Sequence, residues 1–216
     1  MYKLKKSKYL ILIPTYNELN NLKKFLISLN RLAPLCILDD CSTDRTTDWL
    51  LKNKINFIKN RINLGYERNL LNGIKKFKNY CEFLITFDGD GQHKLSDIKR
   101  ILKKKHSYDI IICNRKNKNR FLEEIISYFS YLFFGLRDPI SGFKIYKTSI
   151  LKKKNFEKIG EYFLADFLFS FVKNSNIGNL EITTKKRADE SRVGGFASLS
   201  LKELKILLKI ITIKTF

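Results

Sequence analysis

The sequence predicts an α/β fold, with a mostly parallel sheet that carries helices on both faces. Short apolar runs alternate with longer helix-like segments through the first half of the chain. Strands that are apolar along their whole length are typical of sheets covered on both faces, and helices between them give parallel crossovers. With 216 residues, of which 44% are hydrophobic, the chain suits a single domain with one substantial core.

The alternation can be followed element by element up to about residue 116. The predicted strands are Tyr9–Ile13, Leu35–Leu38, Ile55–Ile58, Glu82–Phe87 and Asp109–Cys113. The predicted helices between them are Leu19–Asn30, Asp44–Asn53, Tyr66–Tyr80 and Leu95–His106. Beyond this point the alternation is lost, and we expect aromatic helices at Phe121–Leu136 and Glu161–Lys173 with a turn at 138–142 between them.

The amino-acid composition excludes fewer classes of function than the pattern of strands and loops does. The net charge of +21 is spread along the chain, so it suits either a solvated surface or an anionic partner such as lipid headgroups. The four cysteines form no CxxC pair, which argues against a structural zinc site. No apolar stretch reaches the length of about 18 to 20 residues that a membrane-spanning helix needs. We therefore expect a protein that does not cross a bilayer by itself.

Three polar loops follow predicted strands. They are residues 14–18, residues 39–44 and residues 88–93. In open parallel sheets ligands bind at the carboxyl ends of the strands, so we expect these loops to converge on one edge. A nucleic-acid-binding module would use the positive charge but would give no reason for acidic loops there. A dinucleotide-binding GxGxxG and a phosphate-binding GxxxxGK[ST] are both absent from the sequence.

The third loop predicts a metal site. Asp88 and Asp90 lie two residues apart beside glycines, which suits a hard cation, Mg²⁺ or Mn²⁺, that keeps positions open for phosphate oxygens. A plain acidic turn is the alternative. An EF-hand calcium loop fails, because it needs Gly where His93 stands and Glu where Lys99 stands.

The first two loops offer nucleotide contacts. Asp40 can accept a hydrogen bond from a base or ribose, and Tyr16 offers an aromatic face with a hydroxyl. A turn or helix cap is the alternative for Asp40, and ordinary packing is the alternative for Tyr16.

In order and spacing, these motifs together resemble family 2 glycosyltransferases. The matching residues are Pro14-x-Tyr16-Asn17-Glu18, Asp39-Asp40-x-Ser42-x-Asp44-x-Thr46, Asn63-x-Gly65 with Gly73, and Asp88-x-Asp90-x-Gln92-His93. The later Asp138-Pro139-Ile140-Ser141-Gly142-Phe143-Lys144 is similar to the DPxSGFR segment of the dolichyl- and polyprenyl-phosphate sugar synthases in that family. The resemblance spans about residues 9 to 200.

The resemblance implies the Rossmann-like GT-A fold and an inverting transfer of sugar from a UDP- or GDP-sugar. Pro14, Tyr16, Glu18, Asp40 and Asp88 would line the donor pocket. Asp88, Asp90 and Gln92 would hold Mg²⁺ or Mn²⁺ against the diphosphate. Residues 1–115 would then form the nucleotide-sugar-binding half and residues 116–199 the acceptor half.

The acceptor decides which further residues act. A polyprenyl phosphate is already anionic and needs cations to hold it, for which Arg115, Arg137, Lys144 and Arg192 are candidates. A sugar hydroxyl needs a carboxylate base, for which Asp138 and Asp166 are candidates. Two departures from the family pattern weaken the prediction of a lipid-phosphate acceptor. Lys144 stands where the family often has Arg, and residues 192–198 lack the family's Lys.

The end of the chain, residues 200–216, predicts an amphipathic helix with leucines at helical spacing and interleaved lysines. It would lie on the bilayer at the cytoplasmic, inner face of the cell membrane, or else pack on its own domain. A soluble transferase acting on a glycan or protein, and a non-catalytic nucleotide-sugar binder, stay open as alternatives.

Overall fold

The computed structural model describes residues 7–104, 107–116, 121–153, 156, 163–185, 204–208 and 210, and of residues 163–167 it describes the backbone. The strands are β1 (Ser7–Thr15), β2 (Leu35–Asp39), β3 (Phe57–Lys59), β4 (Cys81–Thr86), β5 (Ile110–Arg115), β6 (Lys144–Lys147) and β7 (Ile177–Ile182). The helices are α1 (Leu19–Leu32), α2 (Thr46–Lys52), α3 (Tyr66–Phe77), α4 (Leu95–Lys104), α5 (Phe121–Phe134), α6 (Thr148–Lys152) and α7 (Phe163–Val172).

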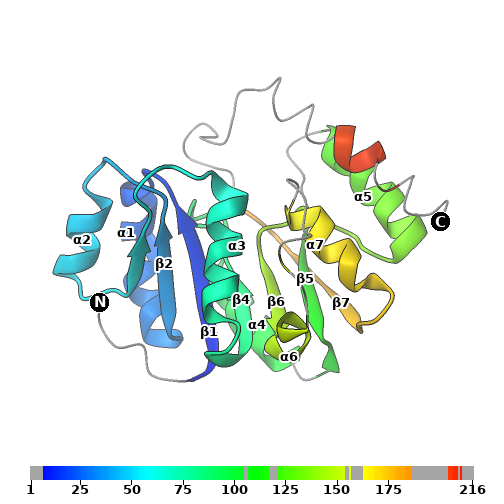
Figure 1. The fold of residues 1–216 in the computed structure, drawn as a ribbon, viewed down its shortest axis with the longest axis horizontal. Coiled ribbons are helices and arrows are strands. Elements are labelled where there is room, and N and C mark those ends of the chain that lie inside the picture. Colours follow the sequence, from blue (N-terminus) through cyan, green and yellow to red (C-terminus); the bar gives the residue numbers. More distant parts are fainter. Residues whose placement is uncertain are drawn as a thin grey trace.

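All seven strands belong to one sheet in the order β3-β2-β1-β4-β6-β5-β7 (Figure 1). Every pairing is parallel except those of β6, which runs antiparallel to both β4 and β5. Helices cover both faces, so the predicted fold class is confirmed. The strand order reverses at β1, whose neighbours are β2 and β4. Such a switch point is where open α/β sheets bind ligands.

Alternate residues of each central strand feed two different cores. In β1, Leu10 and Leu12 join the core beneath α3, α5, α6 and α7, whereas Ile11 and Ile13 join the core beneath α1, α2 and α4. Because both faces are buried, the strands read as continuous apolar runs. This is why the sequence pattern located β1, β2 and β4.

The second half contains two strands that the sequence analysis did not predict. β6 reads Lys-Ile-Tyr-Lys, so its short apolar part is flanked by charges that suggest a loop. Lys144 nevertheless lies fully buried at its start. β7 follows α7 and completes the sheet beside β5. The loss of alternation after residue 116 therefore marks an inserted antiparallel strand and not the end of the sheet.

Near the C-terminus, residues 204–208 and 210 are helical. Ile206 and Ile210 are buried in the same core cluster as Ile126 of α5, whereas Leu204 and Leu208 are exposed. One side of this segment thus packs on its own domain. None of the described helices has the length and apolarity needed to cross a bilayer.

Candidate active site

The first two acidic loops are tied to each other. The backbone of Asn17 lies in the left-handed region (φ 53°), and its N–H donates to the Ser42 hydroxyl at 2.9 Å. The Asn17 side-chain oxygen accepts from the Thr43 N–H at 2.8 Å. Asp44 accepts from the Leu19 N–H at 3.0 Å and from the Thr46 hydroxyl at 2.5 Å. Asp44 Oδ1 also accepts from the Thr46 N–H at 3.2 Å, so one carboxylate accepts from backbone N–H groups at the starts of both α1 and α2.

The predicted nucleotide residues lie at the ends of β1 and β2. Pro14 is buried in β1, while the Tyr16 ring just beyond the strand is partly exposed. Glu18 is buried and accepts from the Asn21 side-chain amide at 2.6 Å. These side chains border the switch point, and the ring of Tyr16 is the most accessible of them.

Asp40 is almost fully buried, and its carboxylate faces the segment before α3. It accepts from the Asn60 side chain at 2.8 Å, from the Leu64 N–H at 2.9 Å and from the Gly65 N–H at 2.8 Å. Gly65 has φ 82°, a conformation that glycine adopts without strain. Asp40 thus fixes the loop 60–65 against β2. A carboxylate has about four acceptor positions, so it can still accept a ligand hydrogen bond.

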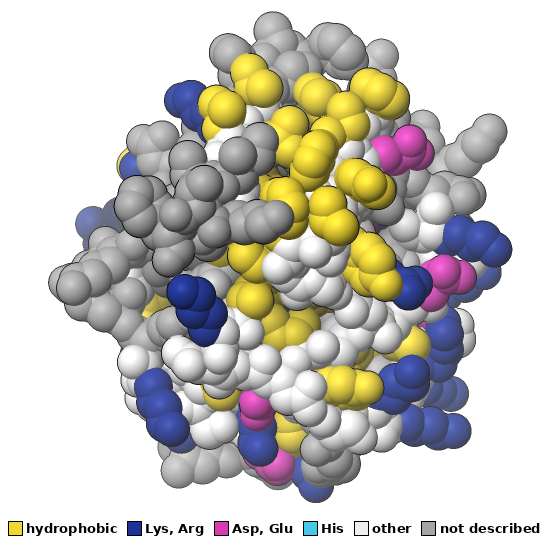
Figure 2. All heavy atoms as spheres, turned by 90° about the vertical axis from the view of Figure 1, so that its right-hand side faces the viewer, with side chains coloured by type: hydrophobic (Ala, Val, Ile, Leu, Met, Phe, Trp, Pro, Cys, Tyr) yellow, Lys and Arg dark blue, Asp and Glu magenta, His cyan; other side chains and the backbone are white. Residues whose placement is uncertain are grey.

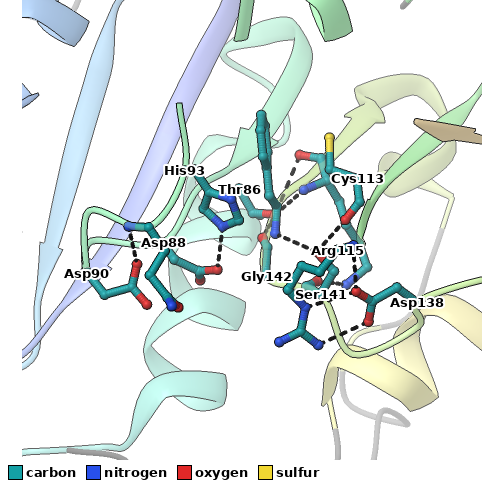
Figure 3. Close-up of polar contacts among 12 residues, drawn as sticks. Thr86, Asp88, Asp90, His93, Cys113, Arg115, Asp138, Ser141 and Gly142 are labelled. Atoms are coloured by element: carbon teal, nitrogen blue, oxygen red, sulfur yellow. Dashed lines mark hydrogen bonds and ion pairs between the residues drawn. The ribbon is translucent and has the colours of Figure 1, made fainter. Parts of the chain in front are cut away.

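Asp88 is the first residue of the third loop and is held from two sides, of which Figure 3 shows the contact with His93. The Tyr66 hydroxyl donates to its Oδ1 at 2.6 Å, and Nε2 of His93 lies 3.1 Å from its Oδ2. Burial raises the pKa of Asp88, but the hydrogen bonds and charge from His93, with Tyr66 and Arg115, outweigh it and hold the pKa below its ordinary value. Asp88 is therefore ionised at neutral pH.

His93 is packed between two phenylalanines. Its ring centroid lies 5.3 Å from that of Phe87 and 5.1 Å from that of Phe143. Because an ionised Asp88 can only accept, Nε2 of His93 carries the hydrogen. Nδ1 is buried and has no hydrogen-bond partner among the described residues. The ring is thus fixed by packing and by a single polar contact, which is to Asp88.

Gly142 allows the loop 138–143 to lie directly against Asp88. A Cβ at this position would collide with both carboxylate oxygens of Asp88 and with the Tyr66 hydroxyl. Thr86 donates its hydroxyl to the Gly142 carbonyl at 2.6 Å, and Ser141 donates its hydroxyl to the Cys113 carbonyl at 2.8 Å. The Ser-Gly pair of this loop therefore joins the ends of β4 and β5.

Asp90 and Gln92 complete the acidic loop. The Gln92 N–H donates to Asp90 Oδ1 at 3.0 Å, and Gly91 between them has φ 75°. The Gln92 side chain donates to the Lys185 carbonyl at 3.1 Å, and the Lys185 N–H donates to the Gln92 carbonyl at 2.9 Å. Gln92 thus links the loop to the segment after β7.

The donor set at this loop fits a divalent cation that is shared with a ligand. No group of three His, Cys, Asp or Glu side chains that could hold a metal occurs among the described residues. Asp88 and Asp90 instead offer two partly exposed carboxylates in one loop. Mg²⁺ is typically held by one or two carboxylates together with substrate phosphates and water, so two are sufficient.

Arg115 and Asp138, expected to act separately, form one buried pair (Figure 3). The Arg115 Nε and Nη2 donate to the two Asp138 oxygens at 2.9 and 3.1 Å, and the Arg115 N–H donates at 3.1 Å. Glu123 of α5 lies 3.4 Å from Arg115 Nη2. Although burial acts to lower it, the charge and hydrogen bonds of Asp138 keep the pKa of Arg115 above its ordinary value.

Lys144 is buried beneath the same loop. Its ammonium group donates to the Ser141 carbonyl. Burial lowers the pKa of Lys144 to about 8, against the attraction of the Asp138 and Asp88 carboxylates. Arg115, Asp138 and Lys144 therefore form a charge cluster on the α5 side of Asp88.

The remaining predicted residues lie apart from this cluster or outside the described residues. Arg137 is exposed, and its guanidinium lies 5.3 Å from the centre of the Tyr131 ring. Asp166 belongs to α7, but its side chain is outside the description, as is the whole of Arg192. The sequence analysis assigned no role to Tyr66 or His93. Tyr66 contacts Asp88 across 22 positions of sequence, so no local pattern signalled it.

The sheet order, the switch point at β1 and the acidic loop after β4 define the chain as a GT-A-type α/β protein. The chain belongs to glycosyltransferase family 2, whose family model, "Glycosyl transferase family 2", matches residues 10–166. The resemblance found in the sequence is thereby confirmed.

Individual proteins agree with this assignment. The uncharacterized protein MJ0544 of Methanocaldococcus jannaschii is 33% identical over 67% of this chain and 74% of its own length. An undecaprenyl-phosphate mannosyltransferase of Micrococcus luteus is 23% identical over 86% of this chain and 87% of its own. Glucosyl-3-phosphoglycerate synthase of Mycobacterium tuberculosis, crystallised with Mn²⁺, UDP and glucosyl-3-phosphoglycerate, superimposes with a TM-score of 0.73 at 12% identity, covering 97% of this chain and 80% of that chain. The last likeness shows the shared fold.

Proposed function

We propose that this chain is an inverting, metal-dependent transferase that moves a sugar from a UDP- or GDP-sugar to a polyprenyl phosphate at the inner face of the cell membrane. The observation that carries the proposal is the Asp88 site. This carboxylate is kept charged by Tyr66 and His93 at the switch point, two residues from a second carboxylate, Asp90.

The donor would lie across the first three loops. Pro14, Tyr16, Glu18 and Asp40 would border its nucleotide, and Asp88, Asp90 and Gln92 would hold Mg²⁺ or Mn²⁺ at its diphosphate. When bound, the metal would neutralise charge on the leaving diphosphate. Mn²⁺ and UDP in the related mycobacterial structure support this choice of donor and metal.

The state of Asp138 favours a phosphate acceptor over a sugar hydroxyl. A general base must be able to reach and take up a proton, whereas Asp138 is fully buried and paired with Arg115 through both oxygens. A phosphate oxygen is already anionic and needs no such base. We therefore assign Asp138 the role of positioning Arg115, which would face the acceptor phosphate, while the fully buried Lys144 adds positive charge behind it.

A thermal-shift screen of nucleotide sugars, with and without Mn²⁺, tests the donor. Ligand at about 100 times its Kd adds about 2.7 kcal/mol to the unfolding free energy. For a domain of this size that corresponds to a Tm rise of about 5 to 10 °C. We expect one nucleotide class to give this rise, and to give it with Mn²⁺ present. If no UDP- or GDP-sugar shifts Tm under either condition, the donor proposal is wrong.

Transfer assays with three acceptors test the rest. We expect labelled sugar to pass from the donor to a polyprenyl phosphate, with no transfer to a small soluble phosphate such as 3-phosphoglycerate or to a sugar hydroxyl. Transfer to 3-phosphoglycerate alone would contradict the polyprenyl-phosphate acceptor. It would show that the chain shares the activity of the mycobacterial synthase as well as its fold. Transfer to a sugar hydroxyl alone would restore the need for a carboxylate base.

A further inference from the structure

Helix α5 buries three polar residues beside Ile126 and exposes mostly large apolar side chains, together with the acidic Glu124. The side buried in the protein includes Glu123, Ser127 and Ser130, and the two serine hydroxyls have no hydrogen-bond partner among the described residues. The opposite side exposes Phe121, Tyr128, Tyr131 and Leu132, whose exposed fractions lie between 53% and 75%. A surface helix in water has the reverse arrangement. The exposed side of α5 is therefore better suited to contact with an apolar environment than with water.

The composition of α5 supports this conclusion. Its 14 residues include no Lys or Arg, although the chain as a whole has 42. Exposed helices elsewhere carry lysines, as in the last turns of α3 and α4. Among α1, α3, α4 and α5, only α5 has no Lys or Arg, and α7 shares this composition.

The C-terminal segment adds to the same surface. Leu204 and Leu208 are exposed, while Ile206 and Ile210 pack into the core cluster that also contains Ile126 of α5. Figure 2 shows the hydrophobic side chains gathered on this side of the molecule, with both basic and acidic side chains along its border. We call the exposed side chains of Phe121, Tyr128, Tyr131, Leu132, Leu204 and Leu208 the α5 face.

We propose that the α5 face inserts into the interface of an anionic bilayer. Tyr, Phe and Leu are side chains suited to the boundary between headgroups and acyl chains. Exposed cations lie close in sequence to this face, namely Lys116 before α5, Arg137 over the Tyr131 ring, and Lys205. They can contact lipid phosphates while the apolar side chains enter the hydrocarbon boundary.

The net charge of the chain indicates which partner covers the α5 face, an anionic bilayer or a second copy of the chain. Each copy carries a net charge of +21, so pairing two copies through this face brings two strongly positive molecules together. An anionic bilayer attracts the same molecule. The charge of the chain is therefore complementary to the bilayer and repulsive toward another copy.

Docking through the α5 face would turn the acceptor side of the site toward the lipid. The inner side of α5 reaches the charge cluster, because Glu123 lies 3.4 Å from Arg115. A lipid phosphate at the bilayer surface would thus approach the partly exposed Arg115 without leaving the headgroup region. This inference rests on the proposed function for its purpose, although the docking itself does not require catalysis.

Co-sedimentation of the full chain with lipid vesicles tests the proposal. The test variant is Tyr131→Ser with Leu132→Ser, and the matched control is Ile27→Ser with Leu51→Ser, two exposed apolar positions on α1 and α2. With vesicles of phosphatidylglycerol and phosphatidylcholine at low salt, we expect wild type and control to bind equally and the test variant to bind at least tenfold more weakly. Pure phosphatidylcholine should bind all three weakly.

Three results would overturn the proposal. They are equal binding by the test variant and wild type, no binding of wild type to anionic vesicles, and a wild-type dimer in light scattering that the test variant abolishes. The last would assign the face to a second copy. The Tm rise with donor and Mn²⁺, measured on the same proteins, separates the two proposals. A normal rise with failed vesicle binding rejects the docking alone, whereas a missing rise in wild type rejects the proposed function.

Discussion

Two regions of the molecule hold their charged residues by different means. The loops after β1, β2 and β4, across which the donor would lie, are called the donor half, and the cluster of Arg115, Glu123, Asp138 and Lys144 is called the acceptor half. In the donor half, Asp40 and Asp44 accept hydrogen bonds from backbone N–H groups and so shape the loops in which ligands would lie. In the acceptor half, the mostly buried Arg115 is paired with the buried Asp138 and approached by the buried Glu123. Loss of a loop contact can be compensated by water, whereas loss of one buried charge leaves its partner unpaired. The acceptor half should therefore be the more fragile under mutation.

The largest effect is expected at Asp138. Asp138→Ala leaves Arg115 charged and mostly buried, with Glu123 as its remaining ion-pair partner at 3.4 Å. Removing one partner of a buried ion pair typically costs about 3 to 5 kcal/mol of unfolding free energy, and we expect the lower end of this range. Urea unfolding followed by circular dichroism measures this loss. As a control, Arg115→Met combined with Asp138→Leu and Glu123→Gln, which removes the charges of Arg115 and of both acidic neighbours, should recover much of the stability. A loss below about 1 kcal/mol for the single change would show that water reaches the pair.

Lys144 should make stability depend on pH at the alkaline end. Burial lowers the pKa of Lys144 to about 8 from an ordinary value of 10.5. Between these values the unfolded chain binds more protons at this residue than the folded chain does, so the free energy of unfolding rises with pH, by about 3 kcal/mol at most. Lys144→Met should remove the rise. If the difference between wild type and variant stays flat from pH 8 to 10.5, Lys144 is not desolvated.

His93 provides a finer test within the Asp88 site. Gln places its amide nitrogen near the position of Nε2, whereas Asn is too short to reach Asp88. We expect His93→Asn to reduce Mn²⁺ affinity in the presence of the donor nucleotide, and transfer, by about 10- to 100-fold, and His93→Gln to retain most of both. Mn²⁺ titration followed by electron paramagnetic resonance measures the affinity. Equal losses in both variants would indicate that ring packing matters and the hydrogen bond does not.

A smaller loss of stability than at Asp138 is expected at Asp40, its counterpart in the donor half. Asp40→Ala releases the Leu64 and Gly65 N–H groups near the surface, at a cost of about 1 to 2 kcal/mol. Because the loop 60–65 borders the nucleotide region, calorimetry should show weaker nucleoside diphosphate binding with the Mn²⁺ requirement preserved. An unchanged Kd would leave Asp40 with a purely structural role. A stability loss as large as that of Asp138→Ala would remove the contrast between the halves.

The same contrast explains what the sequence could predict. In the donor half, apolar runs end directly in acidic loops, so Asp40, Asp88 and Asp90 could be located from periodicity and spacing alone. In the acceptor half, the pairing of Arg115 with Asp138 joins residues 23 apart, and no local pattern encodes it. β6 was missed because Lys144 looks like a loop residue, although its charge is stabilised by distant carboxylates. The hydrogen bond from Tyr66 to Asp88 likewise depends on tertiary packing and could not be predicted from the sequence.

Metal-dependent nucleotide binding at the Asp88 loop is the central claim, and calorimetry on Asp90→Ala tests it most directly. Asp90 is partly exposed in a loop, so its loss should change the free energy of unfolding by less than about 1 kcal/mol. Wild type should bind the nucleoside diphosphate of its donor at least tenfold more tightly with Mn²⁺ than without, and Asp90→Ala should lose this gain while remaining folded. Equal, Mn²⁺-enhanced binding by both proteins would contradict the assignment of the metal to this loop.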